Sequence, residues 1–300
     1  MEQRKFNGDR LRNARIYNGI SLTDLATQAD IKKQSISLYE NGKNVPDHEK
    51  VRVLARILGF PYDYFFQEDK IKAYTETTYF RSQATATKKD RAAQSVKLEF
   101  VAQMYETLWN YIDFPIYKDP KIDFIGFDDP LDCESQEAID EMEIAASKVR
   151  ECWGVPSGPI KDLQYLLEQN GILVTGFSID EDKIDAFSQR TIVDNADVFL
   201  IAVALGSRPE CRLRFDMAHE LGHIVLHPWS EDIESLSKEE FKARERQANM
   251  FASAFLLPRD SFSKDVLQYP TDLKFYLFLK KKWKVSVQAM MYRARQLDII

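Results

Sequence analysis

Short runs of apolar residues at helical spacing follow one another between residues 8 and 66. Leu22, Leu25 and Ala26 share one helix face, and Ser21 with Asp24 three positions later forms an N-terminal capping pair. Asn-Gly pairs at 18–19 and 41–42 mark helix ends. The pattern predicts a bundle of five short helices, the first around residues 11–17 and the others at 22–29, 32–40, 48–58 and 61–65.

Beyond residue 66 the sequence mixes helical and strand periodicity, and a polar, threonine-rich stretch at 70–91 is expected to connect two domains. Apolar spacing predicts helices at 88–112, 135–153, 160–169, from about 214, and at 238–257, and strands at 172–177, 185–188, 191–193 and 198–205. The expected fold class is therefore mainly α with a small β-sheet (α+β). The expected division is a first domain of residues 1–68, a helical connector of 69–154 and a second domain of 155–300.

The composition is that of a globular protein, because 300 residues with 44% hydrophobic content can form two domains with a sizeable core. The longest apolar runs, such as 198–205, are far shorter than the ~18–20 residues of a membrane span, and no apolar stretch of a secretory signal follows residues 1–5. Three widely spaced cysteines, Cys133, Cys152 and Cys211, indicate reduced thiols. We therefore expect a cytoplasmic protein with no membrane partner.

Charge is distributed unevenly along the chain. Residues 1–66 hold 11 Lys and Arg against 8 Asp and Glu, whereas the remainder holds 30 against 39, and the net charge is −6. A mildly basic first part is compatible with an anionic partner, but ordinary fluctuation explains the same imbalance. Charge alone does not decide between the two.

The second and third predicted helices form a helix-turn-helix pattern, since a tight turn joins them and polar residues lie near the start of the second. In such motifs the first residues of that helix contact base edges in the major groove, and Lys and Gln have the chemistry to bind guanine and adenine. Another interpretation is a small helical module that binds protein. The candidate DNA contacts are Lys33, Gln34, Ser35 and Ser37 on the helix and Lys43, as a phosphate contact, just past it.

The residues of this segment resemble a known family. Ser21-Leu22-x-x-Leu25-Ala26, followed by Ile36-Ser37-x-Tyr39-Glu40-Asn41-Gly42-Lys43-x-x-Pro46, is similar to the Xre/Cro-type helix-turn-helix domain over about sixty residues. Val53-Leu54-Ala55-x-x-Leu58-Gly59 is similar to the fourth helix of that family. The resemblance implies that the partner of this domain is a double-stranded DNA operator.

A different chemistry is indicated by His219-Glu220-x-x-His223, an H-E-x-x-H pattern within an apolar, helix-prone run. Positions i and i+4 of a helix lie on the same side, so His219 and His223 can share one Zn²⁺. Glu220 then lies beside the water on the metal and can act as general base. The pattern can arise by accident, but its place after strands and in an apolar helix favours a zinc hydrolase.

Catalytic zinc usually has three protein ligands, so a third is needed. His227 is unsuitable on a continuous helix, because it lies about 12 Å along the axis from His219, and we expect it to be a helix-end residue, with a place near a substrate cleft also open. Asp232 and Glu234 remain possible ligands.

Glu245 is the better candidate, because a carboxylate on the apolar face of the next helix is costly unless it is paired or metal-bound. The competing interpretation is that Glu245 forms a surface ion pair with Arg244 or Arg246.

The two motifs together resemble the ImmA/IrrE family of metallopeptidases. The resemblance rests on His219-Glu220-Leu-Gly-His223 and on Glu245-x-x-Ala248-Asn249-x-Phe251-Ala252…Leu256-Leu257-Pro258, with further agreement at Gly171-Ile172, Asp185-Ala-Phe-Ser188, Arg214-Phe215…Ala218 and the tail from Val285. It covers roughly residues 155–300 and implies a zincin-like domain. It implies His219, His223 and Glu245 as metal ligands and Glu220 as the base. The chain departs from the family pattern at Gln247, where an acidic residue is frequent.

What the resemblance implies about function is regulated proteolysis of a transcriptional repressor, in stress response or in the control of mobile elements. The expected cofactor is Zn²⁺, although Mn²⁺ or Fe²⁺ can also occupy a His/Glu site. The protein substrate is a separate repressor or the chain's own linker near residues 67–95, and homodimerisation is left open. The competing hypothesis is a non-catalytic regulator whose peptidase-like domain senses a ligand, a metal or a partner.

Overall fold

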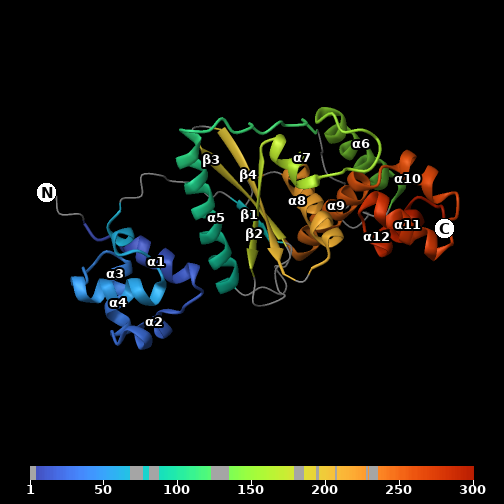
Figure 1. Cartoon of the computed structure of the whole chain (residues 1–300). Helices are drawn as coiled ribbons and strands as arrows, with labels where there is room; N and C mark the ends of the chain where they lie inside the picture. Colours follow the sequence, from blue (N-terminus) through green and yellow to red (C-terminus); the bar gives the residue numbers. More distant parts are fainter. Residues whose placement is uncertain are drawn as a thin grey trace. The chain divides into compact units, whose positions relative to one another are not determined.

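The computed structural model describes residues 5–67, 77–80, 88–122, 135–178, 186–193, 196–206, 208–227, 229 and 236–300. The described residues are mainly helical with one small sheet, which confirms the expected α+β class (Figure 1). The chain divides into two compact units. The first comprises residues 1–73 and 86–108, and the second comprises residues 74–85 and 109–300. Within the described residues, no helix combines the length and the apolar character that crossing a membrane requires.

The first unit begins with the helical bundle expected from the sequence. It contains α1 (Gly8–Tyr17), α2 (Leu22–Ala29), α3 (Lys33–Glu40), α4 (His48–Leu58) and the short 3-10 helix η1 (Tyr62–Phe66). The capping pair forms as expected, because the Ser21 hydroxyl accepts from the backbone amide of Asp24 while the Asp24 carboxylate accepts from that of Ser21.

Apolar packing and an ion pair between α1 and α3 stabilise the bundle. Leu11, Leu25 and Ile36 are fully buried. The Arg15 guanidinium of α1 donates two hydrogen bonds, of 2.6 and 2.9 Å, to the Glu40 carboxylate of α3. A long helix, α5 (Lys88–Trp109), completes the unit, and its Phe100 ring lies 5.4 Å from that of Tyr17.

The second unit contains a four-stranded sheet in the order β1-β3-β4-β2. Its strands are β1 (Thr77–Phe80), β2 (Ile172–Ser178), β3 (Ala186–Val193) and β4 (Ala196–Leu205), and β2 runs parallel to β4 while the other neighbours are antiparallel. The middle of β4 is buried, as its continuous apolar run suggests.

The sequence interpretation of the strands needs two corrections. The two short strands expected at 185–188 and 191–193 form one strand, β3, because the polar pair Gln189 and Arg190 continues the ladder and Arg190 pairs with Asp197 of β4 at 2.7 Å; residue 185 itself lies outside the described residues. Residues 77–80, expected as part of a connector, form the edge strand β1. Threonine and aromatic residues favour strands, but four of them alone give a weak signal.

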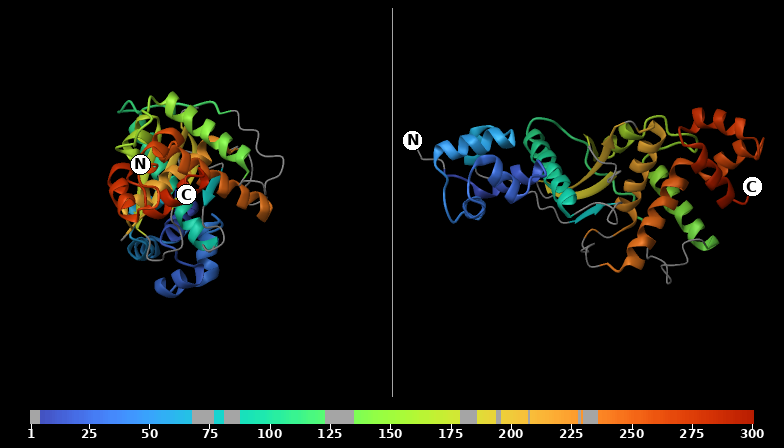
Figure 2. Two further views of the ribbon diagram at one scale, coloured as in Figure 1. Left: turned by 90° about the vertical axis from the view of Figure 1, so that its right-hand side faces the viewer. Right: turned by 90° about the horizontal axis from the view of Figure 1, so that it is seen from below.

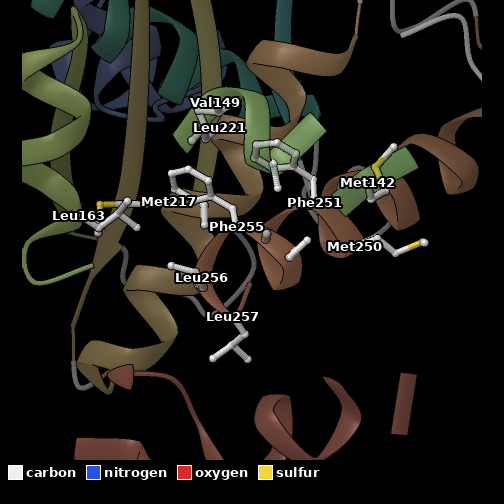
Figure 3. Close-up of a cluster of buried hydrophobic side chains, with 14 of the residues drawn as sticks. Met142, Val149, Leu163, Met217, Leu221, Met250, Phe251, Phe255, Leu256 and Leu257 are labelled. Atoms are coloured by element: carbon white, nitrogen blue, oxygen red, sulfur yellow. The ribbon is translucent and has the colours of Figure 1, made fainter. Parts of the chain in front are cut away.

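The described part of the second unit also contains seven helices: α6 (Gln136–Cys152), α7 (Leu163–Gln169), α8 (Glu210–Leu226), α9 (Lys238–Leu256), α10 (Arg259–Val266), α11 (Leu273–Trp283) and α12 (Val287–Gln296). Helix α8 packs on β3 and β4, and α9 packs on α8 and α6 (Figures 1 and 2). The main apolar core lies where α6, α7, α8 and α9 meet, as Figure 3 shows for Met142, Leu163, Leu221 and Phe255.

Candidate metal centre and nucleic-acid interface

Helices α8 and α9 approach each other closely at Gly222. A Cβ atom at this position would lie only 3.0 Å from the Cα atom of Ala248 and 3.2 Å from the Phe251 ring. The glycine and the alanine therefore let the two backbones come together. As a result, the histidines on α8 face the glutamate that is carried one turn before Ala248 on α9.

Three potential ligand atoms converge at this crossing. The Nε2 atoms of His219 and His223 are 3.0 Å apart, and the Glu245 carboxylate oxygens lie 3.4 Å from the former and 3.2 Å from the latter. A tetrahedral zinc site with bonds of 2.0–2.1 Å requires ligand atoms about 3.3–3.4 Å apart. The side chains of His219, His223 and Glu245 thus fit one divalent ion, and their ligand atoms lie within 4.8 Å of one another.

The electrostatics of the site suit a cation. His219 and His223 are 0% exposed, and the Glu245 side chain is 17% exposed. Burial by itself would raise the pKa of Glu245, but the imidazole rings of His219 and His223 that face its carboxylate outweigh this and hold the pKa well below the usual range. The carboxylate is therefore ionised at neutral pH. It contacts the two histidines and so is not a surface residue paired only with arginines.

Glu220 is fully buried beside the two histidines on α8. The Ser188 hydroxyl of β3 donates a hydrogen bond of 2.6 Å to its Oε2 atom. This contact holds one carboxylate oxygen in a defined place. The sequence marks Ser188 only as part of a short motif and does not indicate this role, because the contact depends on how β3 packs against α8.

A second set of buried contacts lies behind the histidines. His219 Nδ1 lies 3.1 Å from the Asn249 side-chain oxygen, and His223 Nδ1 lies 3.0 Å from Nδ1 of His227. His227 Nε2 lies 3.0 Å from Oε1 of Gln247. Each histidine of the pair therefore has a polar neighbour on the ring edge that faces away from Glu245.

His227 ends α8, as the sequence predicts, but its ring turns inward and is buried. Burial holds the pKa of His227 well below its ordinary value, so the ring is neutral at neutral pH. Its spacing of four residues from His223 could have indicated this contact, whereas the contact with Gln247 depends on α9. Asp232 and Glu234, which the sequence leaves possible as a third ligand, lie outside the described residues.

The candidate nucleic-acid contacts lie on α3 and just after it. Ile36 and Tyr39 are buried against the bundle, which turns the opposite face of the helix outward. Lys33 and Gln34 in the first turn, and Lys43 beyond the helix end, are exposed, whereas Ser35 and Ser37 are half-buried. The arrangement presents one lysine and one amide together at the start of the helix.

Comparison with known proteins gives two family matches. Residues 8–71 match a helix-turn-helix domain, and residues 168–295 match the IrrE N-terminal-like domain, which is a peptidase family. Among solved structures, a Mycobacterium tuberculosis transcriptional regulator is similar at 22% identity, with a TM-score of 0.33, over 51% of this chain and 46% of that one. This likeness spans less than half of that regulator and carries no further conclusion. No curated protein gives a significant match.

Proposed function

Because this chain carries a helix-turn-helix domain over residues 8–71 and an IrrE N-terminal-like domain over residues 168–295, we propose that it is a DNA-binding transcription regulator whose second domain is a zinc-dependent endopeptidase. The observation that carries the enzymatic part is the convergence of His219, His223 and Glu245 within 4.8 Å, with Glu220 buried beside them. Two imidazoles and one carboxylate, with a second carboxylate as base, form an established set for metal-assisted hydrolysis.

Each residue has a defined task in this proposal. His219, His223 and Glu245 hold the ion, and Glu245 contributes the negative charge. A bound zinc ion supplies Lewis-acid chemistry, which polarises a peptide carbonyl and makes water easier to deprotonate. Glu220 accepts the proton of the attacking water and then passes it to the leaving amine. Ser188 holds the carboxylate of Glu220 in place through its hydrogen bond of 2.6 Å.

The proposed substrate is a protein, and a transcriptional repressor is the substrate that best connects the two domains. The DNA-binding part is supported by the exposed Lys33 and Gln34 at the start of α3 and by the family match. Cleavage within the chain's own residues 67–95 is the other option, and much of that segment lies outside the described residues. Zn²⁺ is the proposed ion, and Mn²⁺ or Fe²⁺ would suit the same donors.

A second candidate function is favoured by one observation, the complete burial of His219, Glu220 and His223. A closed centre of this kind suits a sensor, in which a bound metal or a partner changes DNA binding without any cleavage. The peptidase function requires Glu220 as a base, whereas the sensor function does not.

The replacement Glu220→Gln separates the two candidates. Removal of a general base reduces a rate by on the order of 10²–10⁴-fold, whereas the proposed metal ligands remain. We expect new protein N-termini in cells that express the wild-type chain, measured by terminal-peptide mass spectrometry, and their loss with Glu220→Gln. The exposed Glu239 on α9 provides the matched control Glu239→Gln. Cleavage that survives Glu220→Gln, or no cleavage by wild type together with a metal-dependent change in DNA binding, would contradict the peptidase.

A further inference from the structure

A buried row of polar atoms runs from α9 back to the proposed metal centre. Gln247 Oε1 lies 3.0 Å from His227 Nε2, and His227 Nδ1 lies 3.0 Å from His223 Nδ1. On the other side of the His223 ring, Nε2 lies 3.2 Å from a carboxylate oxygen of Glu245. Gln247, His227 and His223 are all buried. The row therefore links an amide on α9 to a metal-facing nitrogen on α8.

One arrangement of protons in this row leaves His223 able to bind the proposed ion. If His223 Nε2 binds the ion, the ring proton of His223 lies on Nδ1 and is donated to Nδ1 of His227, 3.0 Å away. His227 then carries its own proton on Nε2, where Oε1 of Gln247 accepts it. This leaves the Nε2 lone pair of His223 directed at the ion position beside Glu245. The opposite direction would place a proton on His223 Nε2 and would block its use as a ligand.

We propose that His227 and Gln247 are positioning residues that select the metal-binding tautomer of His223 and thereby set the affinity of the centre. For His219 a single contact has the same role, because its Nδ1 lies 3.1 Å from the Asn249 side-chain oxygen, which can accept the ring proton. The inference rests on the metal site proposed above. Outer contacts of this kind change metal affinity by about 10–100-fold when they are removed.

A pair of substitutions at one position isolates the acceptor from the packing. In His227→Asn, the amide oxygen takes the place of Nδ1, whereas His227→Leu has a similar branched shape and no acceptor. Both variants lose the ring and the contact with Gln247, so they share any structural cost. The zinc dissociation constant of the full chain is measured by competition with a chromophoric chelator. We expect affinity within about threefold of wild type for His227→Asn and a loss of about 10–100-fold for His227→Leu.

The far end of the row is tested by Gln247→Met, with Gln94→Met as control. Gln94 is also a buried glutamine, but it lies on α5 in the other unit. We expect zinc binding to weaken with Gln247→Met and to stay unchanged with Gln94→Met. In the metal-free protein, ¹⁵N NMR of the histidine rings reports the tautomer directly. The wild-type His223 ring is expected to carry its proton on Nδ1, and Gln247→Met is expected to give a mixture of both tautomers.

The outcomes are separable. Equal zinc affinities for His227→Asn and His227→Leu, or a wild-type His223 ring protonated on Nε2, would overturn the role of the row. The NMR result decides even if His227→Leu does not fold. Failure of the wild-type chain to bind one equivalent of zinc would instead overturn the metal site itself, and the inference would fall with it.

Discussion

At the candidate centre, the contacts of each side chain set its ionisation and its position. Glu245 remains ionised although it is largely buried, because two imidazoles face its carboxylate at 3.2 and 3.4 Å. Glu220, on the same helix as the imidazoles, is positioned by a serine from a strand. The two glutamates therefore have different proposed roles, Glu245 as a metal ligand and Glu220 as a base, because different neighbours contact them.

Ser188 gives the first prediction at this scale. Its replacement by alanine removes a hydrogen bond to a charged group, which contributes about 1.5–3 kcal/mol, and leaves the proposed ligands in place. We expect peptide hydrolysis to fall by about 10–150-fold with unchanged zinc content, as measured by cleavage rate and metal analysis. Ser261→Ala removes a serine hydrogen bond on α10, away from the centre, and serves as control. An unchanged rate in Ser188→Ala would show that the serine does not position the base.

Glu245 gives the second prediction, which concerns metal content. With Glu245→Ala the site keeps two imidazoles and loses its only proposed anionic ligand. We expect purified wild-type protein to hold about one zinc per chain, a number that follows from a single three-ligand site, and the variant to lose it on dialysis. Treatment of wild type with a chelator should reproduce the loss, and added Zn²⁺ should restore it. Full retention of zinc by Glu245→Ala would point to a different third ligand.

At the scale of elements, the crossing of α8 and α9 is the feature on which the centre depends. The helices meet where Gly222 faces Ala248, and a larger side chain at Gly222 would not fit between them without displacement. Glycine is unfavourable inside a helix by about 1 kcal/mol relative to alanine. Its presence here is explained by the close approach and not by local helix stability.

Gly222→Ala tests this explanation. The added methyl group would meet the Ala248 backbone at 3.0 Å, and crowding of a packed contact costs about 1–3 kcal/mol, more than the gain in helix propensity. We expect a lower melting temperature and weaker zinc binding, because the helices must separate. Gly158→Ala is the matched control, since a Cβ atom there would meet nothing within 4 Å. A stabilised Gly222→Ala variant that binds zinc normally would contradict the close crossing.

At the scale of the whole molecule, the two proposed activities lie in separate units. The helix-turn-helix residues belong to the unit that includes residues 1–73, and the metal centre belongs to the unit that includes residues 109–300. Each unit has its own apolar core. Damage to one activity by a surface substitution should therefore leave the other measurable.

A double replacement, Lys33→Ala with Gln34→Ala, tests this independence. Loss of base contacts costs about 1–3 kcal/mol for each good pair, so operator affinity should fall at least about tenfold in a mobility-shift or anisotropy assay. Zinc content should not change. Ser147→Ala with Lys148→Ala removes the same positive charge from α6 and should leave DNA binding intact. Equal loss of DNA binding in both double variants would assign the effect to net charge and not to α3.

Most of the helices could be predicted from the sequence, because helix periodicity and capping depend on residues that are close together in the chain. The five helices of the first bundle, the capping pair at Ser21 and Asp24 and the placement of His219 and His223 on one helix all follow from spacing over a few residues. The strand at 77–80 and the continuity of β3 were not predicted from the sequence pattern, because both depend on pairing with a neighbouring strand.

The two imidazoles of the candidate centre can be predicted from the amino-acid pattern, since an H-E-x-x-H run on a helix places them on one side whatever surrounds it. The further groups that meet them depend on how the helices and strands pack. This packing brings Glu245 of α9 to the imidazoles, Ser188 of β3 to Glu220, and Gln247 to His227. The last two contacts join residues 32 and 20 positions apart, and they are set by how closely α8 approaches α9 and the sheet, which no local periodicity encodes.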